Sequence, residues 1–346
     1  MRKFLTLSAA LSLMLTASLV ASTASALPQS ANSTVENLLG LLPDSDVMGV
    51  IDMPRAAREL LPLLKSIESG GIAALASDFE QFAGLAGLDP TKVTSAVVGV
   101  KMNGLAIRGG ALIAEGIELD PKSVEKVAIA RNWKFQTIDP DSRPIYRIER
   151  ITAPGAPAAP AEGARDTAPA KSDELFFAPL TSKRVVAGDL ASVRAVLANV
   201  TAGQQKTAAN ATIRGALSQN SSAGLVRFAL VLPADLRQML DGQGELFQQI
   251  AAVKVIFGTI DMTSDQSASI NARLATTSKD EATQMGTSLK SLAALGKTLL
   301  GGSEDVLMKG IAQLLDQVQI GTVENDVSLS LLIPRSLLDQ LTKTPK

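Results

Sequence analysis

The feature that most constrains the fold is a strand–proline–helix junction that occurs twice. An apolar run at 47–53 leads through Pro54 into a helical pattern, and a similar run at 225–232 leads through Pro233 into another. Proline fits the first turn of a helix because its missing N–H has no partner there and its φ is already helical. A third such junction lies at Pro334. The pattern predicts strands that pass directly into helices.

The elements after each of the first two junctions correspond in order. Both halves predict strand, helix, helix, strand, strand and helix, closed by a hairpin and a further helix. The predicted strands and hairpins lie at 93–102, 105–117 and 145–151 with 175–188, and at 253–263, 267–276 and 318–323 with 327–333. Strands joined by short turns are antiparallel. The sequence therefore predicts an α+β fold of two similar halves, made by internal duplication, each an antiparallel sheet covered by helices on one face.

Composition divides the chain into segments. We expect a first α+β domain at 35–200 and a second at 223–342, joined by a polar, small-residue linker at 201–222. An Ala/Pro-rich insert at 153–173 lacks apolar periodicity and is expected to be disordered. We also expect residues 27–34 to form a loose terminus.

The first 26 residues have the pattern of a signal peptide. Arg2 and Lys3 precede an apolar stretch at 4–20, and the small-residue sequence Ala-Ser-Ala at 24–26 suits signal peptidase. The alternative is that this segment is kept as a membrane anchor. Cleavage leaves about 320 residues with a net charge of about −3, which provides no basic surface for nucleic acid. The sequence predicts a protein exported to the periplasm or outside of a bacterium, with no transmembrane span after cleavage.

The chain contains no cysteine and no histidine. Disulfides, lipid attachment at a cysteine, and catalysis or metal binding through His or Cys are therefore excluded. Aromatic residues make up only 3% of the chain, which argues against stacking platforms for sugars or single-stranded nucleic acid. Four glycosylation triplets begin at Asn32, Asn199, Asn210 and Asn220, in Ser/Thr-rich segments where such triplets arise from composition.

Two segments resemble catalytic or nucleotide-binding motifs. Residues 288–298 end in Gly-Lys-Thr like a phosphate-binding loop, but Ser291 stands where the first glycine is required, and the segment has a helical leucine stripe. Ser123 and Lys126 have the Ser-x-x-Lys spacing of penicillin-recognising enzymes, without the partner motifs. The simpler interpretation of both is a helix surface.

Acidic and other polar residues give no stronger signal. Two groups of aspartates lack the spacing of a calcium loop, and turn chemistry explains them; they are Asp44, Asp46 and Asp52, and Asp139 and Asp141. Arg58 and Arg237 occupy matching repeat positions. They are expected to pair with acidic groups in each half, to face a shared partner, or simply to be charges on a helix surface. Trp133 is expected to anchor the first core. We predict no catalytic, cofactor-binding or metal-binding residues, no cofactor, and no enzyme activity.

Residues 42–52, from Leu-Pro-Asp-Ser-Asp into the first strand, and the Val-Val-Ala-Gly-Asp sequence at 185–189 resemble a group of uncharacterised exported bacterial proteins. The resemblance covers about residues 38–200. It implies export and a related fold, and it carries no activity that could be transferred.

Three functions remain open from the sequence. The first is a non-enzymatic envelope protein that binds or scaffolds an unidentified envelope partner through its two halves. The alternative is a carrier that holds an apolar ligand, such as a lipid, in a cleft between the halves. The third and weakest is a hydrolase that uses Asp, Glu, Ser or Lys, for example a paired-carboxylate glycosidase.

Overall fold

The structure is a computed structural model of the chain. It describes residues 29–60, 92–104, 106–139, 143–150, 174–203, 210–219, 224–241, 244–303 and 306–337. Helices and antiparallel strands alternate along this part of the chain, so the α+β class is confirmed. The strands are β1 (Val47–Ile51), β2 (Ser95–Asn103), β3 (Ala106–Glu115), β4 (Trp133–Thr137), β5 (Tyr146–Arg150), β6 (Glu174–Thr181), β7 (Arg184–Gly188), β8 (Val226–Leu230), β9 (Val255–Met262), β10 (Ala268–Ala275), β11 (Gln319–Val323) and β12 (Asp326–Ile333).

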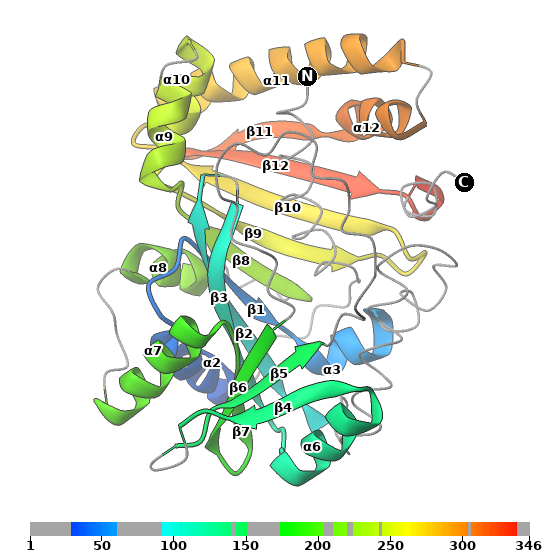
Figure 1. Cartoon of the computed structure of the whole chain (residues 1–346). Helices are drawn as coiled ribbons and strands as arrows, with labels where there is room; N and C mark the ends of the chain where they lie inside the picture. The colour runs from blue at the N-terminus through cyan, green and yellow to red at the C-terminus, as the bar shows by residue number, and fades with distance from the viewer. Residues whose placement is uncertain are drawn as a thin grey trace, which may run out of the picture.

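Within the described residues, the strands form one twelve-stranded sheet in the order β11-β12-β10-β9-β8-β1-β2-β3-β7-β6-β5-β4 (Figure 1). The pairs are antiparallel throughout, as alternation and short turns predict. The two parts of the chain meet where β1 pairs with β8, with Gly49 opposite Phe228. The sheet is therefore continuous from one half of the chain to the other.

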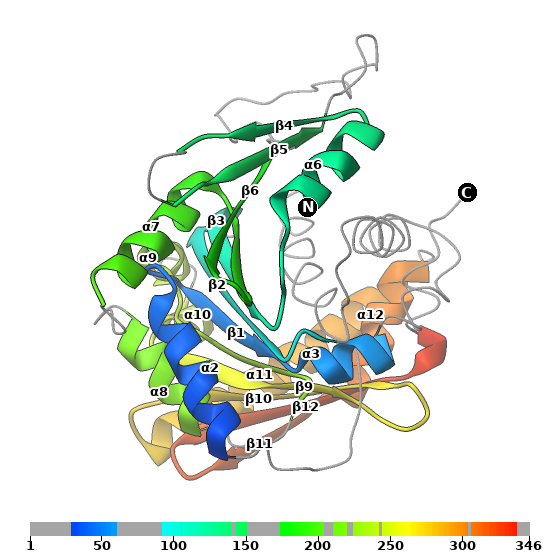
Figure 2. The same cartoon turned by 90° about the horizontal axis from the view of Figure 1, so that it is seen from below.

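Helices lie on both faces of this sheet, so the expectation that they cover one face is wrong. The helices are α2 (Gln29–Leu41), α3 (Met53–Arg55), η1 (Ala56–Leu60), α6 (Pro121–Ala130), α7 (Leu190–Thr201), α8 (Ala211–Gln219), α9 (Ala234–Asp241), α10 (Glu245–Ala251), α11 (Lys279–Gly301) and α12 (Val306–Gln317). In Figure 2 the sheet bends, with α3, α6 and α12 inside the bend and α2, α7 and α8 outside it. The reason is that strands such as β1 and β2 are apolar on both faces, and each face must be covered.

We call the face of the sheet that carries Met48 the outer face, and the face that carries Phe228 the inner face. The largest buried cluster lies on the outer face, where α2, α7 and α8 supply Leu38, Val193 and Ile213 against the strands. Leu38, Met48, Val193 and Ile213 are all fully buried. Smaller clusters on the inner face hold α6, η1 and α11. The outer cluster joins strands of both halves, from Phe176 of β6 to Phe257 of β9, into one core.

Most predicted elements are present, with two exceptions. The run at 175–188 was expected to be one strand, but it forms β6 and β7 with a turn between Thr181 and Arg184. Residues 27–34 were expected to be loose, but α2 begins at Gln29. The turn between Thr181 and Arg184 has neither Gly nor Pro to mark it. By contrast, Pro28 comes directly before α2 in the sequence and is a helix-start signal that the expectation of a loose terminus did not use.

The predicted linker at 201–222 contains a helix. Ile213 and Leu217 of α8 are buried against the outer face, and Asn210, just before the helix, is fully buried. Only three residues of α8 are buried, and the polar composition of the surrounding segment therefore gave no helix signal. The predicted second helix at 72–85, the insert at 153–173 and the signal segment at 1–26 lie outside the described residues.

Candidate functional site

One row of side chains on the inner face crosses the whole sheet. The row takes one residue from each strand, and each of these residues lies directly opposite the next across the strand pairing. All of them are aliphatic, glycine or phenylalanine, except the last two, on β5 and β4. The row is Ile320, Leu329, Ala272, Gly258, Phe228, Gly49, Val98, Leu112, Ala187, Phe177, Tyr146 and Thr137. No position carries a charge. We call this set the inner-face row.

The row beside it is apolar as well. It runs through nine strands as Leu331, Ile270, Ile260, Val226, Ile51, Ala96, Ala114, Val185 and Pro179. Most of this second row is already buried in core clusters, and its buried members are Ile260, Val226, Ala96, Ala114 and Val185. It extends the apolar character of the inner face but leaves the inner-face row as the part that hydrocarbon can contact. Both rows span the two halves of the chain.

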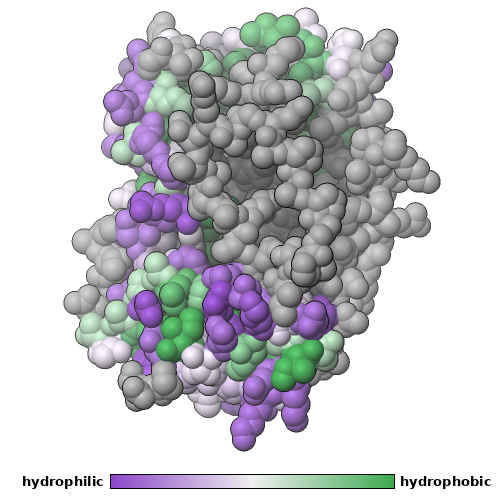
Figure 3. Space-filling view, in the orientation of Figure 1, coloured by the Kyte–Doolittle hydropathy of each residue, from purple (hydrophilic) through white to green (hydrophobic). Residues whose placement is uncertain are grey.

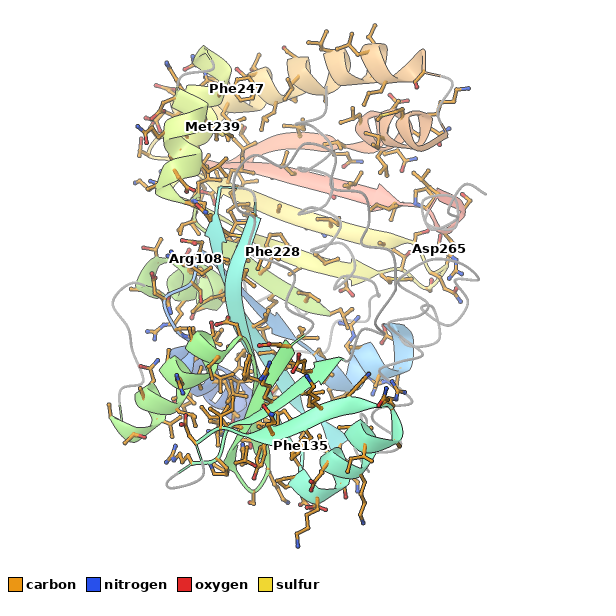
Figure 4. The ribbon with its side chains drawn as sticks, viewed as in Figure 1. Arg108, Phe135, Phe228, Met239, Phe247 and Asp265 are labelled. Carbon is orange, nitrogen blue, oxygen red and sulfur yellow. The ribbon has the colours of Figure 1, made fainter. Side chains whose placement is uncertain are left out.

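Phe228 lies at the centre of the inner-face row, where β8 joins β1. Its two cross-strand neighbours are Gly49 and Gly258, so no side chain flanks its ring on either strand. Figure 4 shows Phe228 in the middle of the sheet and Phe135 at its far end on β4. An aromatic ring next to glycine covers backbone that would otherwise be bare.

The inner-face row is only partly covered. Leu112 is 37% exposed, and Leu175, on the same face of β6, is 46% exposed. Phe228 and Val98 are half-buried, whereas Phe177 is buried in the cluster beneath α6. The middle of the row is therefore the part that an external ligand can reach.

At the β4 end the row becomes aromatic. The Phe135 and Tyr146 rings stack with centroids 5.5 Å apart, and Tyr146 stacks on Phe177 at 5.2 Å. Trp133 packs against the same cluster, as expected for a core anchor, with the Arg131 guanidinium 5.2 Å from its ring centroid. These rings contact one another and α6, and they close this end of the inner face.

The outer face of the second half carries a separate cavity of about 580 Å³. Its lining comes from the end of α8 and from β9, β10, β12 and β11. The polar lining side chains are Gln219, Thr259, Asn271, Arg273, Gln319, Ser328 and Ser330. We call this cavity the outer-face cavity.

The Leu-Pro-Asp-Ser-Asp segment that supports the resemblance has a structural role. The carboxylate of Asp46 accepts hydrogen bonds from the Met102 backbone N–H at 2.8 Å and from Lys101 Nζ at 3.1 Å. The Ser45 backbone N–H donates to Asn210 Oδ1 at 3.1 Å. These bonds attach the start of β1 to β2 and to the residue before α8.

The Gly-Asp sequence at 188–189 is also structural. Asp189 caps α7 by accepting from the Ser192 backbone N–H at 2.9 Å, and it accepts from the Gly110 N–H of β3 at 2.7 Å. Burial raises the pKa of Asp189, but the bonds from Ser192 and Gly110 outweigh it and hold the pKa below its usual value. A Cβ on Gly188 would lie 2.2 Å from the Gly110 carbonyl oxygen.

Asp189→Ala should lower the free energy of unfolding by about 2 kcal/mol at pH 7, since it removes a helix cap and leaves the Gly110 N–H unpaired. Because the folded-state pKa is lowered, this stabilisation is complete above the unfolded value of about 4 and is lost as the pH falls through the folded value. Urea unfolding at pH 7 and pH 3 measures both effects. A difference between wild type and variant that stays constant with pH would contradict this role of the carboxylate.

The two segments that resemble catalytic or nucleotide-binding motifs are parts of helix surfaces. The Ser123 hydroxyl donates to Asp120 Oδ2 at 2.8 Å within the N-cap of α6, and its partner in the motif, Lys126, lies on the same helix. Residues 288–298 lie inside α11, far from any strand-to-helix turn. Neither segment forms a site.

Asp44 and Asp46 share Lys101 as a partner, and the other described aspartates of the two groups lie apart from them. Asp44 pairs with Lys101 at 2.8 Å, Asp52 caps α3 through the Arg55 N–H at 3.0 Å, and Asp139 pairs with Arg194 at 3.1 Å. Asp141 lies outside the described residues. In the described part of the chain, no three acidic residues are grouped as metal ligands would be.

The matched arginines differ in environment. Arg58 is exposed on η1, whereas Arg237 of α9 is half-buried with its Nε lacking a hydrogen-bond partner. The two arginines therefore do not make equivalent contacts with acidic groups in the two halves. Their shared position in the two sequence patterns therefore does not identify a common partner.

Three of the four glycosylation triplets lie in the described residues, and two of them, at Asn199 and Asn210, have their amide nitrogens engaged. Asn210 Nδ2 donates to the Pro43 carbonyl at 2.9 Å, and Asn199 Nδ2 donates to the Leu41 carbonyl at 3.0 Å. Asn210 is also fully buried. The folded chain therefore does not present Asn210 for glycosylation.

The leucine stripe of α11 is exposed at its C-terminal end. Leu289 packs against the inner face, whereas Leu292, Leu295 and Leu299 are 40%, 55% and 70% exposed. Apolar atoms appear along the upper edge of Figure 3, where α11 lies. No helix in the described ranges is both long and apolar enough to cross a bilayer.

No family model and no curated protein matches the chain. Among solved structures, crystal form I of TP0453 aligns over 88% of this chain and 95% of that chain, with 8% identity and a TM-score of 0.41. An overlap this weak supports no conclusion about function.

Of the surfaces described above, the sequence indicated the apolar one through its amphipathic patterns and missed the outer-face cavity. The cavity residues come from four strands and a helix end that only the register brings together. The available signal was the strict polar–apolar alternation of 271–273, 319–321 and 328–330.

Proposed function

We propose that the protein is an exported, non-enzymatic binding protein of the bacterial envelope that holds an apolar ligand, such as an acyl chain, on the inner face of its sheet. The observation that carries this proposal is the charge-free inner-face row, with Leu112 exposed at its middle. This surface favours the carrier over the scaffold. It differs from the expected cleft because the two halves share one sheet.

Hydrocarbon chemistry supports the proposal. Each buried CH₂ group contributes about 0.8 kcal/mol, so a long acyl chain along the row gains enough to bind without any polar anchor. Export is supported by the pattern of residues 1–26 and by the resemblance of 42–52 and 185–189 to exported bacterial proteins. The absence of histidine and cysteine supports a role other than catalysis.

We propose further that the two halves arose by duplication. Counted outward from the β1–β8 pair, the strands run β1-β2-β3-β7-β6 on one side and β8-β9-β10-β12-β11 on the other. In both, three consecutive strands are followed by a hairpin whose second strand lies innermost. The two strand–proline–helix junctions support the same correspondence.

The test is binding of palmitate, measured by native mass spectrometry on the chain without residues 1–26. Wild type should bind the fatty acid, and Leu112→Glu should weaken binding at least tenfold, because a carboxylate beside a hydrocarbon chain loses its hydration. Leu112 is partly exposed, so the variant should still fold, which thermal unfolding verifies.

Leu332→Glu is the matched control. Leu332 is 44% exposed on a strand of the same sheet, but its pairing with Ser269 places it on the outer face. It should bind palmitate like wild type. No adduct on wild type, or equal weakening by both substitutions, would overturn the inner-face proposal.

A further inference from the structure

The outer-face cavity lies on the part of the outer face that no described helix covers. Between β6 and β9 the outer face is covered by α2, α7 and α8, which bury it in the main core. Beyond α8, the outer positions that line the cavity on β10, β12 and β11 are mainly polar, and no described helix packs on them. The exposed apolar residues Leu332 and Val323 lie on the same face outside the cavity. With a volume of about 580 Å³, the cavity is in the range of small-molecule sites.

Its side chains offer hydrogen bonds that the protein does not use. Asn271 is fixed, since its Oδ1 accepts from the Ser330 hydroxyl at 2.9 Å and its Nδ2 donates to the Ser269 hydroxyl at 3.3 Å. By contrast, Arg273, Gln319 and Ser328 have no side-chain hydrogen bond or ion pair in the described part of the chain. The cavity therefore presents a guanidinium, an amide and a hydroxyl that are free to bind.

The charge of the cavity is positive. Arg273 is its charged lining residue, and it lies directly opposite Ser328 on β12 and Phe257 on β9. A second cation, Arg227, occupies the β8 position next to Thr259 in the neighbouring row. Burial lowers the pKa of Arg227, and the charge of Asp52 acts against this. Two cations on the same face of the sheet complement an anion.

Asp326 lies at the margin of the cavity, two residues from Ser328 on the same strand. Its pKa is raised by burial and by the charge of Glu324, while Arg273 acts to lower it. No ion pair joins these two side chains among the described contacts. Arg273 is therefore only partly compensated, and its planar donors remain available for two parallel bonds to an oxyanion.

We propose that the outer-face cavity is a binding site for a small organic oxyanion, with Arg273 binding its carboxylate or phosphate and Gln319 and Ser328 binding its polar groups. The polar side chains of this site and the apolar side chains of the inner-face row point to opposite faces of the sheet. The two sites share strands, because Ile320, Leu329 and Ala272 of the row also border the cavity.

The test is an NMR titration of the mature chain with succinate and, separately, with inorganic phosphate, at constant ionic strength. Either anion should shift the backbone amide signals of β10 and β12 in a saturable way, and the anion that does so identifies the preferred group. Arg273→Gln should weaken this binding at least tenfold, and Asp326→Asn should strengthen it by removing the competing carboxylate.

Arg58→Gln is the charge-matched control. Arg58 is exposed on η1, away from the cavity, so its loss should leave the titration unchanged. If neither anion shifts β10 and β12, or if Arg273→Gln and Arg58→Gln bind like wild type, the proposal is wrong. Equal weakening by both variants would also overturn it, since it would show a general charge effect.

Discussion

Asn210→Ala is expected to lower the free energy of unfolding by about 3 kcal/mol. The side chain is fully buried, and its amide makes three bonds to one loop: it accepts from the Ser45 N–H and donates to the Pro43 and Leu42 carbonyls. Alanine leaves these buried backbone groups without partners, at about 1 kcal/mol each. Urea unfolding monitored by circular dichroism measures the loss.

Asn199→Ala is the control for this prediction. Asn199 is half-buried and makes a single described bond, to the Leu41 carbonyl at 3.0 Å. Its replacement should cost about 1 kcal/mol. Equal losses for the two variants would show that Asn210 does not link the start of β1 to α8.

Gly258→Val is expected to prevent folding or to destabilise the protein by at least about 4 kcal/mol. A Cβ at this position would lie 2.1 Å from the Asn271 carbonyl oxygen and 2.8 Å from the Ala272 Cα. Both are backbone atoms of the paired strand, so neither can move aside without breaking the β9–β10 pairing. Soluble yield and thermal unfolding are the measurements.

Gly215→Ala provides the opposite expectation. Gly215 lies within α8, and a Cβ there would meet nothing within 4 Å. Alanine should stabilise the protein by about 0.5–1 kcal/mol because it restricts the unfolded chain and favours the helix. A stable Gly258→Val variant would mean that the sheet can widen at β9.

The sequence predicted the fold best in segments where hydrophobic periodicity and a start or stop residue indicate the same element. Apolar runs that end in a proline led correctly to β1 and β8, and Asp120-Pro121 marked the start of α6. The long amphipathic pattern of α11 was equally clear. These elements combine hydrophobic periodicity with a residue that marks their start.

The elements that were missed lack such a residue or depend on distant partners. The β6–β7 turn has no Gly or Pro, and α8 has three buried positions that have meaning only against the outer face. Helices cover both faces because central strands such as β1 are apolar on both sides. That these strands belong to one sheet shared by the two halves is not revealed by local pattern. Tertiary pairing decided these features.

The candidate surfaces divide in the same way. An apolar inner face follows from apolar strands, so a hydrophobic surface was predictable although its position was not. The outer-face cavity requires β10, β12 and β11 to align so that Arg273 meets Ser328. Register of this kind is set by strands that are far apart in the chain.

The pairing of β1 with β8 has a consequence for how the chain folds. β1 is the first strand, yet the partner for one of its edges begins at Val226, and the Asn210 that fixes its start lies 165 residues after Ser45. Closing so long a loop is slow, because the chain entropy is lost before the contacts are gained. During synthesis, β1 therefore presents a bare edge that can pair with a neighbouring chain. A fragment that ends before β8 should aggregate where the whole chain folds.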